Sequence, residues 1–165
     1  MRAFSTLHQL LGLVGWLVIS FITAGIGAIA SVDATQFYAD LTQPDWAPPA
    51  GAFGPVWTTL FALMGIAAWL VWREGGWRRH QGALTLFLVH LAVNALWSWL
   101  FFVWHLGALA FVEVILLWGM ILATLIAFWR VRPLAGLLLV PYLAWVSLAT
   151  ALTYTVWQLN PQLLG

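Results

Sequence analysis

The sequence predicts an all-helical integral membrane protein, a bundle of five transmembrane helices in one domain over residues 1–165. Hydrophobic residues make up 64% of the chain and charged residues only 7%, against roughly 25% charged residues in an ordinary soluble domain. Five apolar stretches each approach or exceed the roughly 20 residues that a helix needs to cross a bilayer. They are too long and too continuous for the alternating strands of a membrane barrel, so helices are expected.

The five helices follow the order of the apolar stretches. These stretches cover about residues 7–31, 54–72, 82–103, 106–129 and 134–157. The first stretch is longer than the apolar core of a secretion signal, so we interpret it as a membrane helix. Pro141, near the start of the last stretch, removes one helical hydrogen bond and is expected to open a kink.

Residues 32–53 form the one extended polar connection. Proline fixes φ and restricts the residue before it, so Trp46-Ala47-Pro48-Pro49 is expected to be a stiff, extended corner. Such a corner caps a site beneath it or simply connects two helices, and both interpretations stay open.

The basic residues predict the orientation in the membrane. All six are arginines, and they precede the first helix, separate the second from the third, or separate the fourth from the fifth. The positive-inside rule therefore places the N-terminus in the cytoplasm and the C-terminus outside. The expected location is a bacterial cell membrane, and the helical build favours an inner membrane, while an outer-membrane location stays open. Six scattered arginines and a net charge of +1 do not make a nucleic-acid-binding surface.

Several kinds of chemistry are excluded by residue type. Cysteine is absent, which excludes disulfides, thiolate metal sites and cysteine nucleophiles. The four histidines form no i, i+4 pair with one another, so no metal site is expected. No hydrolase triad and no phosphate loop is visible, so we predict no catalytic residue and no cofactor.

Two strongly polar side chains, Asn94 and Glu113, lie inside the predicted spans, where such groups suggest function. Each has a structural alternative, an interhelical hydrogen bond for Asn94 and a partly solvated anchor for Glu113. At 1.5 Å per residue, Asn94 and Trp145 lie about 18 Å from the cytoplasmic start of their helices, near the level of Glu113, with Trp57 about one turn above. These levels predict an apolar pocket in the outer half, roofed by the first loop.

The thirteen tryptophans fall into two main groups. Those at helix ends fit the interfacial belt of membrane proteins and receive no site role: Trp72, Trp77, Trp104, Trp129 and Trp157. Those further in are either bulky packing or the wall of a pocket: Trp57, Trp97, Trp99, Trp118 and Trp145.

Five ordered motifs resemble the TspO/translocator family, also called the peripheral-type benzodiazepine receptor or tryptophan-rich sensory family. They are Trp46-Ala47-Pro48-Pro49, Gly54-Pro55-Val56-Trp57, Asn94-Ala95-Leu96-Trp97, Ala110-Phe111-Val112-Glu113 and Pro141-Tyr142-Leu143-Ala144-Trp145. The resemblance spans nearly the whole chain and implies a five-helix bundle, usually a homodimer, that binds porphyrins and isoquinoline-type ligands below the first loop. It implies that Trp57 and Asn94 bond a ligand carbonyl and that Trp145 lines the pocket.

The expected ligand-binding residues combine the depth argument with this resemblance. They are Trp46, Pro48, Trp57, Asn94, Trp97, Glu113, Tyr142 and Trp145. The sterol-recognition pattern of the family is incomplete, because Leu152 and Tyr154 are followed by no basic residue. This puts cholesterol binding in doubt.

The leading hypothesis is a membrane receptor, sensor or transporter for porphyrins and other apolar ligands. One alternative is an enzyme for light- and oxygen-dependent porphyrin degradation, in which the pocket tryptophans act as redox groups. Another is a proton-coupled exporter that uses Glu113, which requires a deeply placed, titrating carboxylate.

Overall fold

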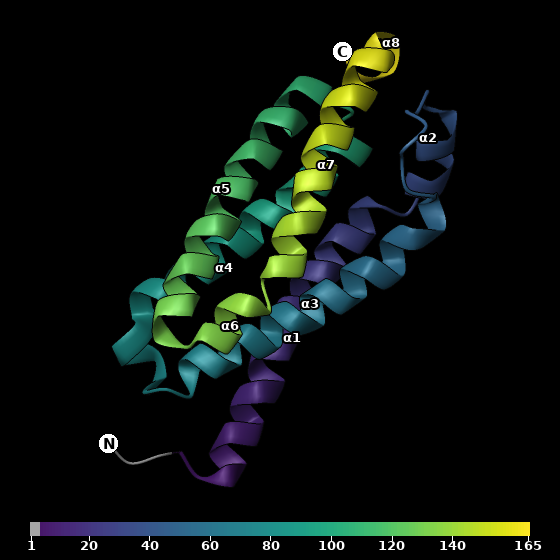
Figure 1. The fold of residues 1–165 in the computed structure, drawn as a ribbon. Helices are drawn as coiled ribbons and strands as arrows, with labels where there is room; N and C mark the ends of the chain where they lie inside the picture. The colour runs from purple at the N-terminus through teal and green to yellow at the C-terminus, as the bar shows by residue number, and fades with distance from the viewer. Residues whose placement is uncertain (1–3) are drawn as a thin grey trace.

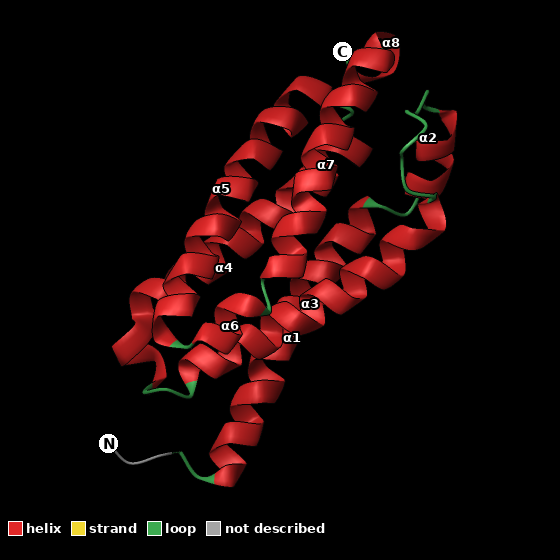
Figure 2. Ribbon diagram, in the orientation of Figure 1, coloured by secondary structure: helices red, strands yellow, loops and turns green. Residues whose placement is uncertain are grey.

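The computed structural model describes residues 4–165, so Arg2 lies outside the described residues (Figure 1). Within residues 4–165 the chain consists of helices and short connections, with no strand (Figure 2). Five spans are long and apolar enough to cross a membrane, and they confirm the predicted fold class. These spans are Thr6–Ala30, Ala50–Trp72, Gly76–Val103, Gly107–Val131 and Pro133–Leu159.

The first span is α1 (Thr6–Ala30), which begins after Ser5, whose hydroxyl accepts a hydrogen bond from the His8 amide. The first loop is not irregular throughout, because it contains the seven-residue helix α2 (Ala34–Asp40). After α2 the chain turns at Asp45 and Trp46 and runs without helical structure to Pro49, which is extended (φ −65°, ψ 147°). The expected proline corner is thus confirmed at its proline end.

The second span, α3 (Ala50–Trp72), begins four residues before the predicted start and carries Pro55 in its second turn. The third span is α4 (Gly76–Ser98), which continues into a π-helical turn, η1 (Trp99–Val103). Its helical φ/ψ angles are interrupted at His80, two residues before the predicted start at Gly82.

The fourth span is α5 (Gly107–Val131). The last span is divided into α6 (Pro133–Leu137) and α7 (Val140–Leu159), and a final turn, α8 (Pro161–Leu164), follows. Pro141 occupies the first turn of α7, where a missing amide hydrogen is tolerated. The kink expected at Pro141 is therefore confirmed, as a break in the helix just before it.

Close packing of α1 against α3 depends on a glycine. A Cβ atom at Gly65 would lie 2.8 Å from the Leu17 side chain and 3.3 Å from the Trp16 carbonyl oxygen. One turn away, the Ser20 hydroxyl donates a 2.6 Å hydrogen bond to the Phe61 carbonyl oxygen of α3. On the other side of the bundle, α5 packs against α4, α6 and α7.

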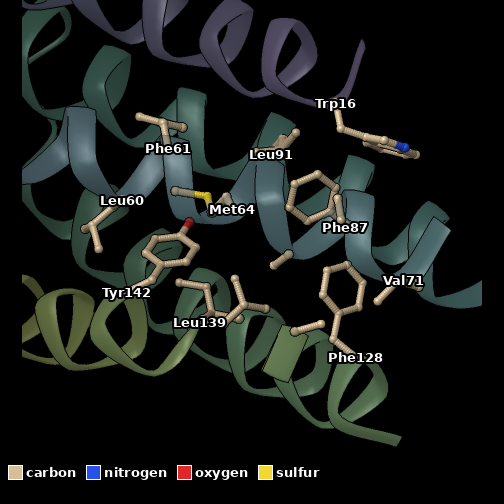
Figure 3. Packing of buried hydrophobic residues seen from close by; sticks show 14 of the residues in the cluster. Trp16, Leu60, Phe61, Met64, Val71, Phe87, Leu91, Phe128, Leu139 and Tyr142 are labelled. Carbon is tan, nitrogen blue, oxygen red and sulfur yellow. The ribbon is translucent and has the colours of Figure 1, made fainter. Parts of the chain in front are cut away.

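Two groups of buried side chains hold the bundle together. The larger includes Trp16, Met64, Phe87, Phe128 and Tyr142, and Figure 3 shows these residues among the side chains of the core. The smaller joins the first loop to the ends of the helices nearest α2. It consists of Tyr38, Leu41, Phe101, Ala110, Leu152, Val156 and Leu164.

The loop arginines that the structure describes lie at the end of the bundle away from α2. Arg132, before α6, forms a 3.1 Å ion pair with Glu74 in the turn between α3 and α4. The Arg73 guanidinium lies over the Trp69 ring, 4.8 Å from its centroid. This end therefore carries the charges expected to face the cytoplasm.

Candidate ligand-binding cavity

A cavity of about 580 Å³ lies in the half of the bundle nearest α2. Its walls come from α1, α3, α4, η1, α5 and α7, and α2, within the first loop, contributes Ala34, Thr35 and Tyr38. The volume falls within the range of small-molecule sites in proteins, roughly 300 to 1,000 Å³. No charged side chain is found among the described residues that line it.

Four of the eight residues expected in the site line this cavity. They are Trp57 from α3, Asn94 and Trp97 from α4, and Trp145 from α7. Three separate helices thus bring aromatic rings and one amide to a single space. The other four, Trp46, Pro48, Glu113 and Tyr142, are outside the lining.

The corner of the first loop reaches the cavity through another residue. The Tyr38 ring lines the cavity, and its hydroxyl donates a 2.9 Å hydrogen bond to the Pro48 carbonyl oxygen. Trp46 is 49% exposed. Pro48 therefore positions a cavity-lining side chain through this hydrogen bond, while the Trp46 side chain lies on the surface.

Asn94 is not isolated at the cavity wall, because a buried hydrogen-bonded chain runs from it into the core. The Asn94 Nδ2 donates a 2.6 Å hydrogen bond to the Tyr142 hydroxyl, which lies 3.0 Å from His90 Nε2. The His90 Nδ1 lies 2.7 Å from the Phe87 carbonyl oxygen. Tyr142 and His90 are each 1% exposed, so the chain is closed to solvent beyond Asn94. It joins α4 to α7 at the edge of the cavity.

Glu113 is buried in α5 beside Val114, which lines the cavity. Its two carboxyl oxygens are buried and have no hydrogen-bond partner within residues 4–165. The indole nitrogens of Trp97 and Trp145 are likewise buried and unpartnered in the same range. Their rings therefore face the cavity with carbon atoms, and their N–H groups do not.

The cavity opens sideways between α1 and α3. Phe21, Gly25 and Ala28 of α1 line it and are exposed on the surface of the bundle, as are Gly54 and Thr58 of α3. In a membrane-spanning bundle such an opening faces the lipid.

Sequence reasoning missed two parts of this site. The first is α1, whose lining residues are mostly glycine, alanine and small hydroxyl side chains, which carry no sign of function. The second is His90, an ionisable side chain inside a predicted span, which the rule applied to Asn94 and Glu113 would also have selected. Sequence reasoning considered the histidines only for their spacing, which bears on metal binding and not on a single buried histidine.

Comparisons with known proteins agree with these features. The model of the TspO/MBR family matches residues 7–158. The chain is 43% identical over 130 residues to "Tryptophan-rich protein TspO" of Chlorobaculum tepidum, covering 78% of this chain and 82% of that protein. It is 40% identical over 130 residues to "Translocator protein" of Homo sapiens, covering 78% and 77%. It is 35% identical over 149 residues to "Tryptophan-rich sensory protein" of Cereibacter sphaeroides, covering 88% and 92%.

Proposed function

The chain belongs to the TspO/MBR family, and on that premise we propose that it is a membrane receptor, sensor or transporter that binds porphyrins and other apolar ligands in the cavity. The observation that carries this proposal is the cavity of about 580 Å³, lined by Trp57, Asn94, Trp97 and Trp145. Aromatic walls with few polar groups suit a flat, apolar ligand. The opening between α1 and α3 offers such a ligand a path from the lipid.

A cavity-filling variant tests this function. Ala149 lines the cavity from α7, whereas Ala151, two residues away, is exposed and outside the lining. Ala149→Phe is expected to weaken porphyrin binding by about tenfold or more, which corresponds to about 1.4 kcal/mol. Ala151→Phe is the matched control and should bind normally. Quenching of tryptophan emission on porphyrin titration measures both, and equal affinity in the two variants would place binding elsewhere.

The Asn94 amide gives a second test. Asn94→Ala is expected to weaken a carbonyl-bearing isoquinoline ligand by about 1 to 2 kcal/mol, the usual range for a hydrogen bond and its unpaired partner. Trp129→Phe, at the arginine-bearing end, should leave affinity unchanged. Wild-type affinity in Asn94→Ala would remove Asn94 from the site.

A proton-coupled exporter is the second candidate, because the Glu113 carboxyl is buried without a hydrogen-bond partner in residues 4–165. Intramembrane carboxyl groups commonly mark proton pathways. Glu113→Gln should then abolish ligand-driven proton flux into liposomes while ligand binding persists. Equal flux in both proteins would exclude this mechanism. Progressive bleaching of a bound porphyrin in light and oxygen would instead favour the degrading enzyme.

We also propose that the N-terminus is cytoplasmic and the C-terminus outside, on the strength of the arginine asymmetry. Because the chain has no cysteine, Ser5→Cys and Asp40→Cys can be labelled one at a time in intact cells. An impermeant reagent is expected to label Asp40→Cys only, and labelling of Ser5→Cys would reverse the topology.

A homodimer is the proposed assembly, as the family resemblance implies. Mass measurements in detergent and in nanodiscs are expected to give twice the monomer mass. A monomer in both media would contradict the proposal.

A further inference from the structure

The hydrogen-bonded chain behind the cavity has a direction that its geometry determines. A neutral imidazole carries one N–H, and the 2.7 Å contact of His90 Nδ1 with the Phe87 carbonyl oxygen requires that hydrogen on Nδ1. His90 Nε2 is then an acceptor, so the Tyr142 hydroxyl donates to it across 3.0 Å. The Tyr142 oxygen in turn accepts from Asn94 Nδ2.

This direction fixes the orientation of the Asn94 amide. Because the Tyr142 hydrogen is used by His90, the amide must meet Tyr142 with its nitrogen and cannot meet it with its oxygen. Asn94 Oδ1 makes no hydrogen bond within residues 4–165, and it is not fully buried. Since Asn94 lines the cavity, its Oδ1 is an acceptor available there. The second Nδ2 hydrogen stays free for a ligand carbonyl, so Oδ1 adds to that role and does not replace it.

The hydroxyl groups of the cavity also offer mainly acceptors. Seven hydroxyl side chains line the cavity, and five of them donate to backbone carbonyl oxygens. These five are Thr23, Ser31, Tyr38, Thr58 and Thr153. Their hydrogens are occupied, while their oxygens retain lone pairs.

The indole groups add little donor capacity. The N–H groups of Trp97 and Trp145 are buried away from the space. Among the described lining residues, Trp57 has the one indole N–H that is not buried in this way. The two remaining hydroxyls, of Thr35 and Ser98, make no hydrogen bond within residues 4–165, so each can donate or accept. With five hydroxyl hydrogens in use and two indole N–H groups buried, the lining side chains still offer more acceptors than donors.

We propose that the cavity selects uncharged apolar ligands that donate a hydrogen bond at Asn94, and that His90 sets this preference as a positioning residue. The inference rests on the proposed ligand-binding function and adds the polarity of the ligand. The absence of charge among the described lining residues disfavours an ionised group inside the cavity.

The position of the hydrogen on the His90 ring is tested first, without any ligand. Nitrogen-15 NMR of histidine-labelled protein in nanodiscs distinguishes protonated from bare imidazole nitrogens, and His90→Leu identifies the His90 signals by their loss. We expect Nδ1 to be protonated and Nε2 bare. A protonated Nε2 would overturn the proposal.

The selectivity is tested with carbazole and dibenzofuran, two flat tricyclic molecules of nearly the same shape. Carbazole carries an N–H donor where dibenzofuran carries an oxygen acceptor. Wild-type protein is expected to bind carbazole about 5- to 10-fold more tightly, the ratio that about one hydrogen bond supplies. In His90→Leu the Tyr142 hydroxyl is free to donate to Asn94 Oδ1, so this ratio should fall to about one or below.

Controls separate this inference from the proposed function. His8→Leu, at the far end of α1, should keep the wild-type ratio. If His90→Leu does not fold, Tyr142→Phe, which also releases the Asn94 amide, should lower the ratio instead. Tricycles that bind without discrimination would refute the selectivity alone, whereas failure of both to bind would refute the proposed apolar site as well.

Discussion

Replacing Tyr142 by phenylalanine tests how strongly the buried chain stabilises the packing of α4 against α7. Phenylalanine keeps the ring, so the change removes only the hydroxyl. That hydroxyl is bonded to Asn94 Nδ2 at 2.6 Å and to His90 Nε2 at 3.0 Å. The substitution therefore leaves two polar groups without their partner.

The magnitude follows from the burial of each group. His90 is 1% exposed, so its Nε2 finds no replacement, and an unsatisfied buried acceptor costs about 1 to 3 kcal/mol. Asn94 borders the cavity, where water can replace the lost partner, and hydrogen bonds between membrane helices average only about 0.6 kcal/mol. Together we expect the free energy of unfolding to fall by about 2 to 3 kcal/mol.

Reversible unfolding in SDS mixed micelles, followed by tryptophan fluorescence, measures this loss. Tyr154→Phe is the matched control, because Tyr154 is exposed and its hydroxyl makes no hydrogen bond within residues 4–165. That control should change stability by less than about 0.5 kcal/mol, as surface substitutions usually do. If the two variants are equally stable, the chain contributes nothing and the reasoning is wrong.

Three further predictions concern the fold. Gly65→Val should destabilise the protein by about 1 to 3 kcal/mol through overpacking against α1, whereas Gly15→Val, whose Cβ meets nothing within 4 Å, should not, in the same SDS assay. Asn160→Ala removes two hydrogen bonds that its side chain shares with the first-loop backbone, so residues 41–49 should exchange amide hydrogens faster. Arg132→Ala breaks an exposed ion pair with Glu74 and should cost less than about 1 kcal/mol in unfolding titrations.

The spans could be predicted because bilayer thickness sets the length of an apolar helix. Each predicted start lies within about six residues of the observed one, and the largest difference is at α4, which begins at Gly76. The additional turns of α4 precede the break at His80 and are polar, so hydropathy does not include them. The helix α2 was missed because seven residues in a polar loop give no periodic signal.

The depth of the candidate site in the membrane could be predicted from the sequence, but the helix faces that line it could not. The sequence places Asn94, Trp145 and Glu113 at similar levels, yet Glu113 lies outside the cavity lining. Rise per residue gives height along a helix, whereas the face that a side chain presents depends on how the helices pack. Tyr142 likewise lies behind Asn94 rather than beside the ligand space.

The polarity of the cavity could not be predicted from residue types, because it depends on which hydrogens are already used. An isolated Asn94 amide could meet Tyr142 with its oxygen or with its nitrogen, and only the chain through Tyr142 and His90 assigns the nitrogen to Tyr142 and leaves Oδ1 available in the cavity. His90 thereby influences a space that it does not line. On the proposed selectivity, a histidine hydrogen bonded to a carbonyl oxygen one turn away sets, through a tyrosine, the acceptor that Asn94 offers in the cavity.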